Sequence, residues 1–418
     1  MGSALPKAVD STVVERHEKK GFRVGASELN GWRTNMEDAH LIHICDDWAF
    51  FGVFDGHGGD ACANFVAPRM EKELKDKGCP EDDEAVRRML FAIDDEFMKM
   101  SEEGGSTATM CLVHKPRGSG EKHKLRVINA GDSRVLLGKR NGQIVDGGGT
   151  DQGLTIDHKP DNPMERERIE AAGEQVIITF GNCARVSGNL AVSRGFGDRK
   201  YKTNWPDKAP EKSAVTVDPD LINIECDETD FIVLVCDGVS EGDFPNSQVI
   251  SLIAKELEKS NDPGAAARAV CHKAVERNSK DNISCMVVLL DGSRDVEKNI
   301  EFRAGPVDKL DDQNYFEAYQ AMAKRADLSV AEAVEIRYGM LDSIRSMLES
   351  DELSSSLSAE DIIDRFGSCP TTDDGKPCLK FLKEELELLG KVDDPVGSKE
   401  RKDFFENWLS KTMSRESF

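Results

Sequence analysis

The most restrictive feature of the sequence is an apolar, strand-like run at residues 50–54 that ends in Asp55-Gly56-His57-Gly58-Gly59. Glycines weaken a regular strand and let the backbone approach another group closely. A carboxylate and an imidazole at such a strand end are suited to metal binding and proton transfer. A plain turn would explain the acid and the glycines, but turn chemistry does not require a histidine. We therefore interpret this strand end as part of a functional site.

The sequence predicts alternating short strands and helices over residues 22 to 293. The strand segments are rich in β-branched and aromatic residues, whereas the helical segments carry apolar residues at helical spacing. Helices cluster between groups of strands, which is typical of an α+β sandwich and not of a doubly wound parallel sheet. The predicted strands are 22–27, 48–54, 107–113, 124–129, 134–138, 231–236 and 283–290, and the predicted helices are 60–77, 83–100, 163–172, 246–259 and 263–278.

Two of the predicted strands, 124–129 and 134–138, are joined by only a few residues. Parallel strands need a long crossover connection, so a short link favours antiparallel pairing. We therefore expect these two strands to pair with each other.

The sequence changes character after about Arg303, where β-branched runs give way to helical periodicity. Ser329 and Glu332 have the spacing of a capping box ahead of an apolar stripe. We expect an N-terminal extension at residues 1–21, a sandwich domain at 22–302, and a C-terminal domain at 303–418 with roughly three helices packed on or beside the sandwich. The stripe consists of Val330, Val334, Leu341, Ile344 and Leu348.

The chain carries 55 Lys and Arg residues against 78 Asp and Glu residues, a formal net charge of −23. Nucleic acids and anionic membranes attract positively charged proteins, so neither is expected as the main partner. The sequence has no run of 18 or more apolar residues, and stable membrane insertion is not expected. Gly2 could accept a myristoyl group, but Pro6 stands where that motif requires Ser or Thr.

The 11 cysteines are scattered and contain no C-x-x-C pair. Several lie inside apolar runs, where cysteine acts as a small hydrophobic residue. This pattern predicts a reducing location, cytoplasmic or also nuclear, and argues against a zinc cluster.

Acidic residues recur at the ends of predicted strands and in tight turns. Each alone is more simply a turn or capping residue. Together they can converge on one edge of a sheet, where their repulsion would be severe without a cation. Oxygen ligands without a Cys/His cluster favour Mg²⁺ or Mn²⁺ over Zn²⁺. The acids are Glu37, Asp38, Asp55, Asp132, Asp237 and Asp281.

The neighbours of these acids indicate a reaction. Bound metal ions would activate water for attack on an electrophile. Arg33 can bind a phosphate through two hydrogen bonds, and His57 can give a proton to a leaving oxygen. For His158, a second histidine near a predicted turn, we favour a structural role. The residues therefore predict a phosphoester hydrolase.

A series of short motifs follows in a fixed order. They are Gly31-Trp32-Arg33, Met36-Glu37-Asp38-Ala39-His40, Asp55-Gly56-His57-Gly58-Gly59, Gly105-Ser106-Thr107-Ala108, Gly131-Asp132-Ser133-Arg134, Asp157-His158-Lys159-Pro160, the segment 191–198, Cys236-Asp237-Gly238 and Asp281-Asn282. With these motifs the chain resembles the metal-dependent protein serine/threonine phosphatases of type 2C over residues 22–293. The resemblance implies two packed antiparallel sheets flanked by helices, a four-layer sandwich, and makes residues 22–302 the catalytic domain.

The resemblance also implies a binuclear metal centre. Asp55 would bridge two Mg²⁺ or Mn²⁺ ions, and Asp237 with Asp281 would complete the ligands of one ion. The ligands implied for the other ion are the carbonyl of Gly56 and, partly through water, Glu37 and Asp38.

A weaker third ion is implied at Asp132. After Asp237-Gly238 the family usually has a tryptophan and then an aspartate, whereas this chain has Val239-Ser240-Glu241. Glu241 keeps the charge but is one methylene longer. The departure bears on the third ion and not on the two core ions.

By resemblance, a metal-bridging hydroxide would attack phosphorus, Arg33 would hold the phosphate, and His57 would protonate the departing Ser or Thr oxygen. The substrates would be phosphorylated proteins, with a variable flap after residue 198, through Trp205, beside the site. The helical domain could bind a regulatory partner.

Two other hypotheses remain. A catalytically dead relative that only binds partners would be expected to lack core carboxylates, yet Asp55, Asp237 and Asp281 are present. A hydrolase of small phosphoesters stays open, because the metal site does not encode the substrate.

Overall fold

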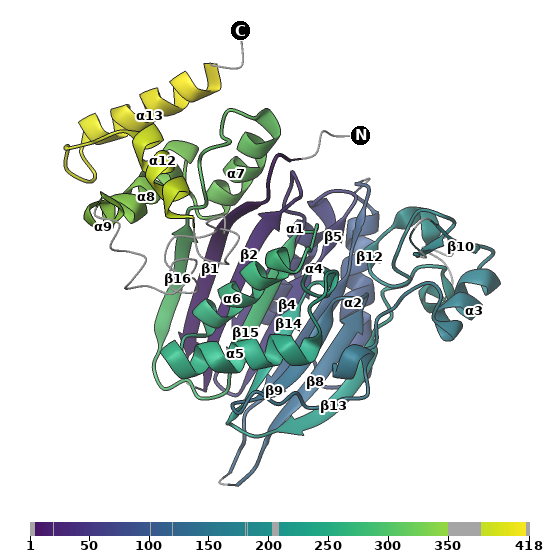
Figure 1. Ribbon diagram of the computed structural model, residues 1–418. Coiled ribbons are helices and arrows are strands. Elements are labelled where there is room, and N and C mark those ends of the chain that lie inside the picture. Colours follow the sequence, from purple (N-terminus) through teal and green to yellow (C-terminus); the bar gives the residue numbers. More distant parts are fainter. Residues whose placement is uncertain are drawn as a thin grey trace.

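The computed structural model describes residues 5–19, 21–100, 102–118, 120–179, 181, 183–202, 209–349 and 378–414. Its centre is a pair of antiparallel sheets (Figure 1). The first sheet has the strand order β16-β1-β2-β15-β14-β9, and the second has the order β13-β8-β7-β4-β3. The first sheet consists of β1 (Val9–Lys19), β2 (Phe22–Gly31), β9 (Arg134–Lys139), β14 (Asp230–Val235), β15 (Ile283–Leu289) and β16 (Val296–Arg303). The second consists of β3 (Ala39–Ile44), β4 (Trp48–Phe54), β7 (Ala108–His114), β8 (His123–Ala130) and β13 (Asp220–Cys226).

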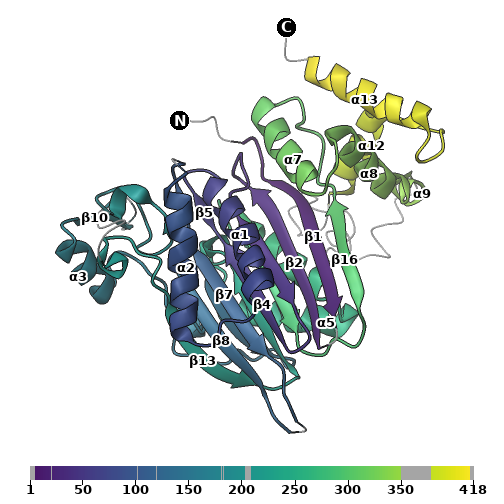
Figure 2. The ribbon, with the colours of Figure 1, turned by 180° about the vertical axis from the view of Figure 1, so that it is seen from behind.

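The two sheets and the helices on their outer faces form four layers, with an apolar cluster at each of the three interfaces. One cluster lies between the two sheets and includes Phe51. Another lies between the first sheet and helices α5 (Asn246–Ser260) and α6 (Pro263–Glu276). A third lies between the second sheet and helices α1 (Ala61–Lys77) and α2 (Asp83–Met98). Figures 1 and 2 show the two helical layers from opposite sides, and the predicted α+β class is confirmed.

The helices on the first sheet follow from the sequence. In α5, Val249, Ile253 and Leu257 recur at helical spacing and are buried against the sheet. The side chain of Asp262 caps α6 by accepting a hydrogen bond from the backbone N–H of Gly264 at 2.8 Å. Pro263 occupies the first turn, where its missing N–H costs nothing. The predicted bounds therefore lie within two residues of the observed ones.

The predicted pairing of residues 124–129 with 134–138 is wrong. These residues form β8 and β9, which lie in different sheets: β8 pairs with β7 and β13, and β9 pairs with β14. A short link limits the distance between two strands but not the sheet to which each belongs. Facing sheets are about 10 Å apart, a gap that a few extended residues can span. The link therefore crosses the sandwich and carries Asp132 between the sheets.

The first sheet begins before the predicted boundary at residue 22. Residues 9–19, predicted as part of an N-terminal extension, form β1, which pairs with β2 on one side and β16 on the other. The strand was hard to recognise because its second half, residues 15–19, contains only polar residues, among them Glu15 and His17. The sandwich therefore extends from residue 9 to residue 303, and its first and last strands, β1 and β16, pair with each other.

The C-terminal region is helical, as expected. Ser329 and Glu332 form the predicted capping box, and all five residues of the predicted stripe are buried. The described helices number more than the three expected, and their apolar cluster also contains Val9 and Val13 of β1. No helix within the described ranges is long and apolar enough to cross a membrane. The helices are α7 (Gln313–Arg325), α8 (Val330–Asp342), α9 (Arg345–Glu349), α12 (Leu379–Leu389) and α13 (Lys399–Met413).

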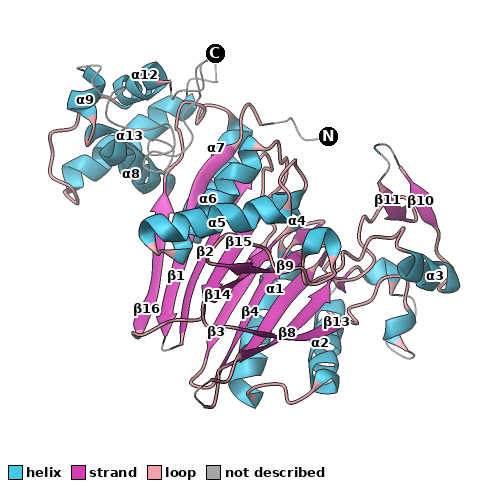
Figure 3. Cartoon of the chain, turned by 60° about the horizontal axis from the view of Figure 1, so that its bottom comes forward, coloured by secondary structure: helices cyan, strands magenta, loops and turns pink. Residues whose placement is uncertain are grey.

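A small lobe stands away from the sandwich beside the end of β13 (Figure 3). It contains α3 (Pro163–Ala171) and a hairpin of β10 (Val176–Ile178) and β11 (Ala184–Val186). Its apolar cluster also includes Tyr201 and Val215. The lobe thus begins well before residue 198, where the flap was expected to start, and Trp205 lies outside the described residues.

Candidate active site

Asp55 follows the end of β4, in a turn that two hydrogen bonds to Thr107 hold in place. The backbone N–H of Thr107 donates to the carbonyl of Asp55 at 2.9 Å, and the backbone N–H of Asp55 donates to Oγ1 of Thr107 at 3.3 Å. The Thr107 hydroxyl also lies 2.8 Å from the Ser133 hydroxyl, next to Asp132. Thr107 therefore holds two acid-bearing turns together, a role that the sequence analysis missed.

Asp237 and Asp281 meet because β14 and β15 are antiparallel neighbours. Asp237 follows the end of β14, and Asp281 precedes the start of β15. A side chain on Gly238 would place its Cβ 2.0 Å from the carbonyl oxygen of Asn282, so only glycine permits this approach. The Asp-Gly pairing in the sequence is the signal of that contact.

The loop between β2 and β3 brings Glu37 and Asp38 to the same place. Asn282 fixes it by donating from Nδ2 to the carbonyls of Asn30 and Asn35 at 3.1 and 2.8 Å. Its Oδ1 accepts from the backbone N–H of Glu37 at 2.9 Å. Asn282 is thus a supporting residue of this loop.

Asp38 is buried with one carboxylate oxygen unsatisfied. Its Oδ2 accepts a hydrogen bond from the Ser284 hydroxyl at 2.7 Å. Its Oδ1 is buried and has no hydrogen-bond partner among the described residues. An orphaned buried oxygen of this kind calls for a ligand or a proton.

Burial and neighbouring negative charge shift the pKa values of these carboxyl groups upward. Burial, followed by the charge of Asp132, raises the pKa of Asp237 to about 8. Burial also raises the pKa of Asp38 to about 7, against the hydrogen bond from Ser284. Burial and the charges of Asp237 and Asp38 raise the pKa of Asp55 well above its ordinary range. These groups resist simultaneous ionisation unless a cation joins them.

Two cationic side chains already contact the acids. Nη2 of Arg33 donates to Oδ2 of Asp281 at 2.8 Å, and Lys159 forms an ion pair with Asp132. Within the described part of the chain, no three His, Cys, Asp or Glu side chains stand as a ready-made metal cage. The structure thus brings the predicted ligands together with their charges partly balanced by Arg33 and Lys159.

The donor set nevertheless suits a hard divalent cation. It offers carboxylate oxygens that repel one another, and Asp38 contributes the unsatisfied one. Gly56 lies against this set, since a Cβ there would approach the carbonyl oxygen of Glu37 to 2.3 Å. The residues therefore fit the metal ions that the resemblance implies.

Glu241 does not join the carboxylates. It is exposed, and its described side-chain contacts are with the turn before Asp281. Its Oε2 accepts hydrogen bonds from the backbone N–H of Lys280 at 3.0 Å and from the Ser279 hydroxyl at 3.4 Å. These contacts give Glu241 a local role in fixing that turn.

His57 is paired with an acid that the sequence analysis did not select. Its Nε2 lies 2.9 Å from both carboxylate oxygens of Asp198. A small sheet of order β12-β6-β5 makes this contact by joining the segments that carry both residues. Burial lowers the pKa of His57, but the charge and hydrogen bond of Asp198 outweigh burial and raise it. The strands are β5 (Gly56–His57), β6 (Gly105–Ser106) and β12 (Phe196–Gly197).

Gly105 was the available signal of that pair. A Cβ on Gly105 would lie 2.3 Å from Oδ2 of Asp198 and 2.6 Å from Nε2 of His57. The glycine in the 105–108 motif therefore leaves room for the two side chains.

His158 has the structural role predicted for it. Its Nδ1 accepts a hydrogen bond from the backbone N–H of Gly131 at 3.0 Å, and its Nε2 lies 3.1 Å from Oδ2 of Asp220. The ring thereby supports the turn that carries Asp132.

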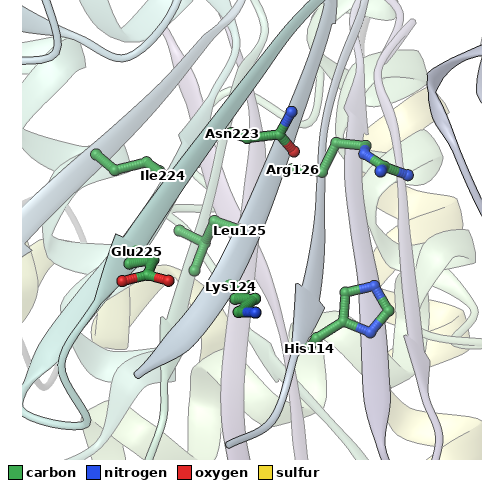
Figure 4. Close-up of a pocket in the computed structure, with 7 residues that line it drawn as sticks. All are labelled: His114, Lys124, Leu125, Arg126, Asn223, Ile224 and Glu225. Atoms are coloured by element: carbon green, nitrogen blue, oxygen red, sulfur yellow. The ribbon is translucent and has the colours of Figure 1, made fainter. Parts of the chain in front are cut away.

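A pocket of about 420 Å³ lies elsewhere, on β7, β8 and β13 (Figure 4). Its β8 residues lie at the start of that strand, whereas Asp132 follows the end of the strand, so the pocket is separate from the carboxylates. Its lining residues are His114, Lys124, Leu125, Arg126, Asn223, Ile224 and Glu225.

Comparison with known proteins decides the family. A model of the family described as protein phosphatase 2C matches residues 22–283. The chain belongs to this family. Protein phosphatase 2C homolog 2 of Schizosaccharomyces pombe is 33% identical over 318 residues, 69% of this chain and 80% of that protein. Protein phosphatase 1A of Homo sapiens is 31% identical over 328 residues, 72% of this chain and 80% of that protein.

A solved structure of a phosphatase from Toxoplasma gondii has a similar fold, with a TM-score of 0.60 and 27% identity. The match covers 70% of this chain and 99% of that one. This phosphatase 2C is therefore a protein serine/threonine phosphatase, and the predicted resemblance is confirmed.

Proposed function

We propose that this phosphatase 2C hydrolyses phosphoserine and phosphothreonine in proteins with two Mg²⁺ or Mn²⁺ ions bound at its carboxylates. The observation that carries the proposal is the burial of Asp38, Asp55 and Asp237 among other carboxylates, where burial and then neighbouring negative charge raise the pKa of each. Asp281 and Asp132 add their charges to the same place.

Different residues would hold the two core ions and a weaker third ion. Bound metal ions would neutralise the carboxylates and activate water for attack on phosphorus. Asp132 is the residue available for a weaker third ion, and the exposed position of Glu241 gives that ion less support. The proposed ligands of the two core ions are Asp55, Asp237, Asp281, Glu37, Asp38 and the carbonyl of Gly56.

The chain's own side chains would do the rest. Arg33 is half exposed, so its guanidinium can reach a substrate phosphate as well as Asp281. Asp198 would keep a proton at Nε2 of His57 and favour the doubly protonated ring, and His57 would supply its other proton, at Nδ1, to the departing oxygen.

The proposed partners are phosphorylated proteins, and the helical domain is the proposed place for a regulatory partner. We also propose a cytoplasmic location, extending to the nucleus. The nine described cysteines between residues 45 and 285 are free thiols, a state that a reducing compartment maintains.

The test is hydrolysis of a phosphothreonine peptide and of a small phosphoester, each with Mn²⁺ or with EDTA. We expect peptide turnover to require the metal. The Asp55→Asn variant should lose both this turnover and tight Mn²⁺ binding. Asp47→Asn, at the opposite and exposed end of β4, is the matched control. Full peptide turnover by Asp55→Asn would refute the metal site, and turnover of the small ester alone would favour the other substrate class.

A further inference from the structure

A side chain of the helical domain reaches the loop that carries Glu37 and Asp38. Arg325 lies in the last turn of α7, and its Nη2 donates to the carbonyl of Asp38 at 2.5 Å. The same nitrogen lies 3.4 Å from the carbonyl of Met36. The contact joins residues separated by 287 positions, so it belongs to the tertiary fold and not to local structure.

The other side of the guanidinium is anchored in the first sheet. Nη1 of Arg325 donates to both carboxylate oxygens of Glu28, each at 2.8 Å. Glu28 is a buried residue of β2, and its Oε2 also lies 3.6 Å from Nδ1 of His40. Arg325 therefore has a fixed position from which it holds the loop backbone.

Apolar packing fastens the same loop to the helical domain. Met36 is buried in the cluster that also contains Tyr319 and Met322 of α7. The loop is thus fixed to α7 through a side chain at residue 36 and a carbonyl at residue 38.

These attachments hold the backbone of Asp38 and do not involve its carboxylate. The backbone of Asp38 is held by Arg325, while its side chain contacts Ser284 and keeps a buried, unsatisfied Oδ1. A group that fixes the backbone of a ligand in this way reduces the ordering that metal binding would otherwise require.

We infer that Arg325 is a positioning residue that fixes Glu37 and Asp38 for metal binding. This inference rests on the proposed function. By linkage, docking of α7 strengthens metal binding, and metal binding strengthens docking of α7 to the same extent. Lysine cannot replace arginine fully, because a single ammonium lacks the planar fork that spans the Glu28 carboxylate and the Asp38 carbonyl.

The test measures Mn²⁺ binding to the full-length protein by calorimetry and kcat on a phosphothreonine peptide at saturating Mn²⁺. We expect Arg325→Ala to weaken Mn²⁺ binding about 10–100-fold, the usual effect of losing a residue that supports a metal ligand. Arg325→Lys should lie between that variant and the wild type. The kcat at saturating Mn²⁺ should change much less than the affinity, because the excess metal restores the ligand positions.

Arg16→Ala is the matched control. Arg16 also pairs with two acids, Asp262 and Glu301, and its side chain is 24% exposed, against 21% for Arg325. It joins β1 to α6 and β16, away from the loop, so its loss should leave Mn²⁺ affinity unchanged.

Hydrogen exchange gives a second readout that needs no metal. Amides of the loop 35–38 should exchange faster in Arg325→Ala and not in Arg16→Ala. If Arg325→Ala fails to fold, Arg325→Lys and Glu28→Gln carry both measurements, and each should show a smaller change in the same direction.

Wild-type affinity and wild-type loop exchange in the folded variants would overturn the inference while leaving the proposed function standing. Absence of Mn²⁺ binding in the wild type would overturn both.

Discussion

Nη2 of Arg33 donates a hydrogen bond to Oδ2 of Asp281 at 2.8 Å, so the proposed phosphate-binding residue is paired with a proposed metal ligand. The pair has a counterpart at the far ends of the same two strands, where Arg23 of β2 contacts Asp291 after β15 at 2.9 Å. One strand pair thus carries two similar ion pairs, of which one adjoins the carboxylates.

Arg33→Ala should raise the KM for a phosphothreonine peptide roughly 10–100-fold, because a hydrogen bond to a charged group contributes about 1.5–3 kcal/mol. Steady-state kinetics at saturating Mn²⁺ measures the effect. Arg23→Ala removes the equivalent distant pair and should leave KM unchanged. Equal KM values for the two variants would remove Arg33 from phosphate binding.

Asp198→Asn should lower kcat about 10–100-fold for a phosphothreonine peptide, a part of the 10²–10⁴-fold that a positioned general acid contributes. It should affect p-nitrophenyl phosphate far less, since that leaving group needs no proton. In combination with His57→Gln it should cost no more than His57→Gln alone, because the two residues act as a unit. Additive losses would show that Asp198 does not act through His57.

Glu165 should stabilise the fold above acidic pH. Burial raises its pKa, but the hydrogen bond from Arg194 and the charge of Arg168 outweigh burial and lower the pKa from 4.5 to about 2. A pKa that is lower in the folded state contributes stability above the unfolded value, and this contribution is lost as the pH falls from about 4.5 to 2. The lowering corresponds to about 3 kcal/mol.

Urea unfolding of Glu165→Gln between pH 7 and pH 3 measures that contribution. The variant should be less stable at pH 7 and should lose less stability on acidification than the wild type. Glu170→Gln, in an exposed pair with Arg166 on the same helix, is the control and should change little. Parallel acid profiles for the wild type and Glu165→Gln would contradict the assignment.

Much of the sandwich follows from local sequence, because its strands are apolar runs between turn residues. The strand predicted at 48–54 is β4 itself. Strand β1 escaped prediction because Glu15 and His17 make it polar, and its membership of the sheet depends on β16, far along the chain. The partner of a strand is a property of the whole fold, so the pairing of β8 and β9 was also mistaken.

The candidate site divides in the same way. Asp55, Asp237 and Asp281 were recognisable because each stands beside a glycine or an asparagine at the end of an apolar strand. Asp198 and Arg325 act through contacts with residues more than 140 positions away, at His57 and Asp38. Sequence spacing contains no signal for such a contact, except where a glycine such as Gly105 leaves room for it.

The pairing of β1 with β16 sets an order of events for a chain emerging from the ribosome. Thr12 of β1 lies opposite Arg303 of β16, so one edge of β1 stays unpaired until the chain has been made as far as residue 303. An unpaired strand edge is a template for association with other chains. Newborn chains that stall before residue 303 should therefore expose the edge of β1 to other chains, and the segment after β15 covers that edge when it arrives.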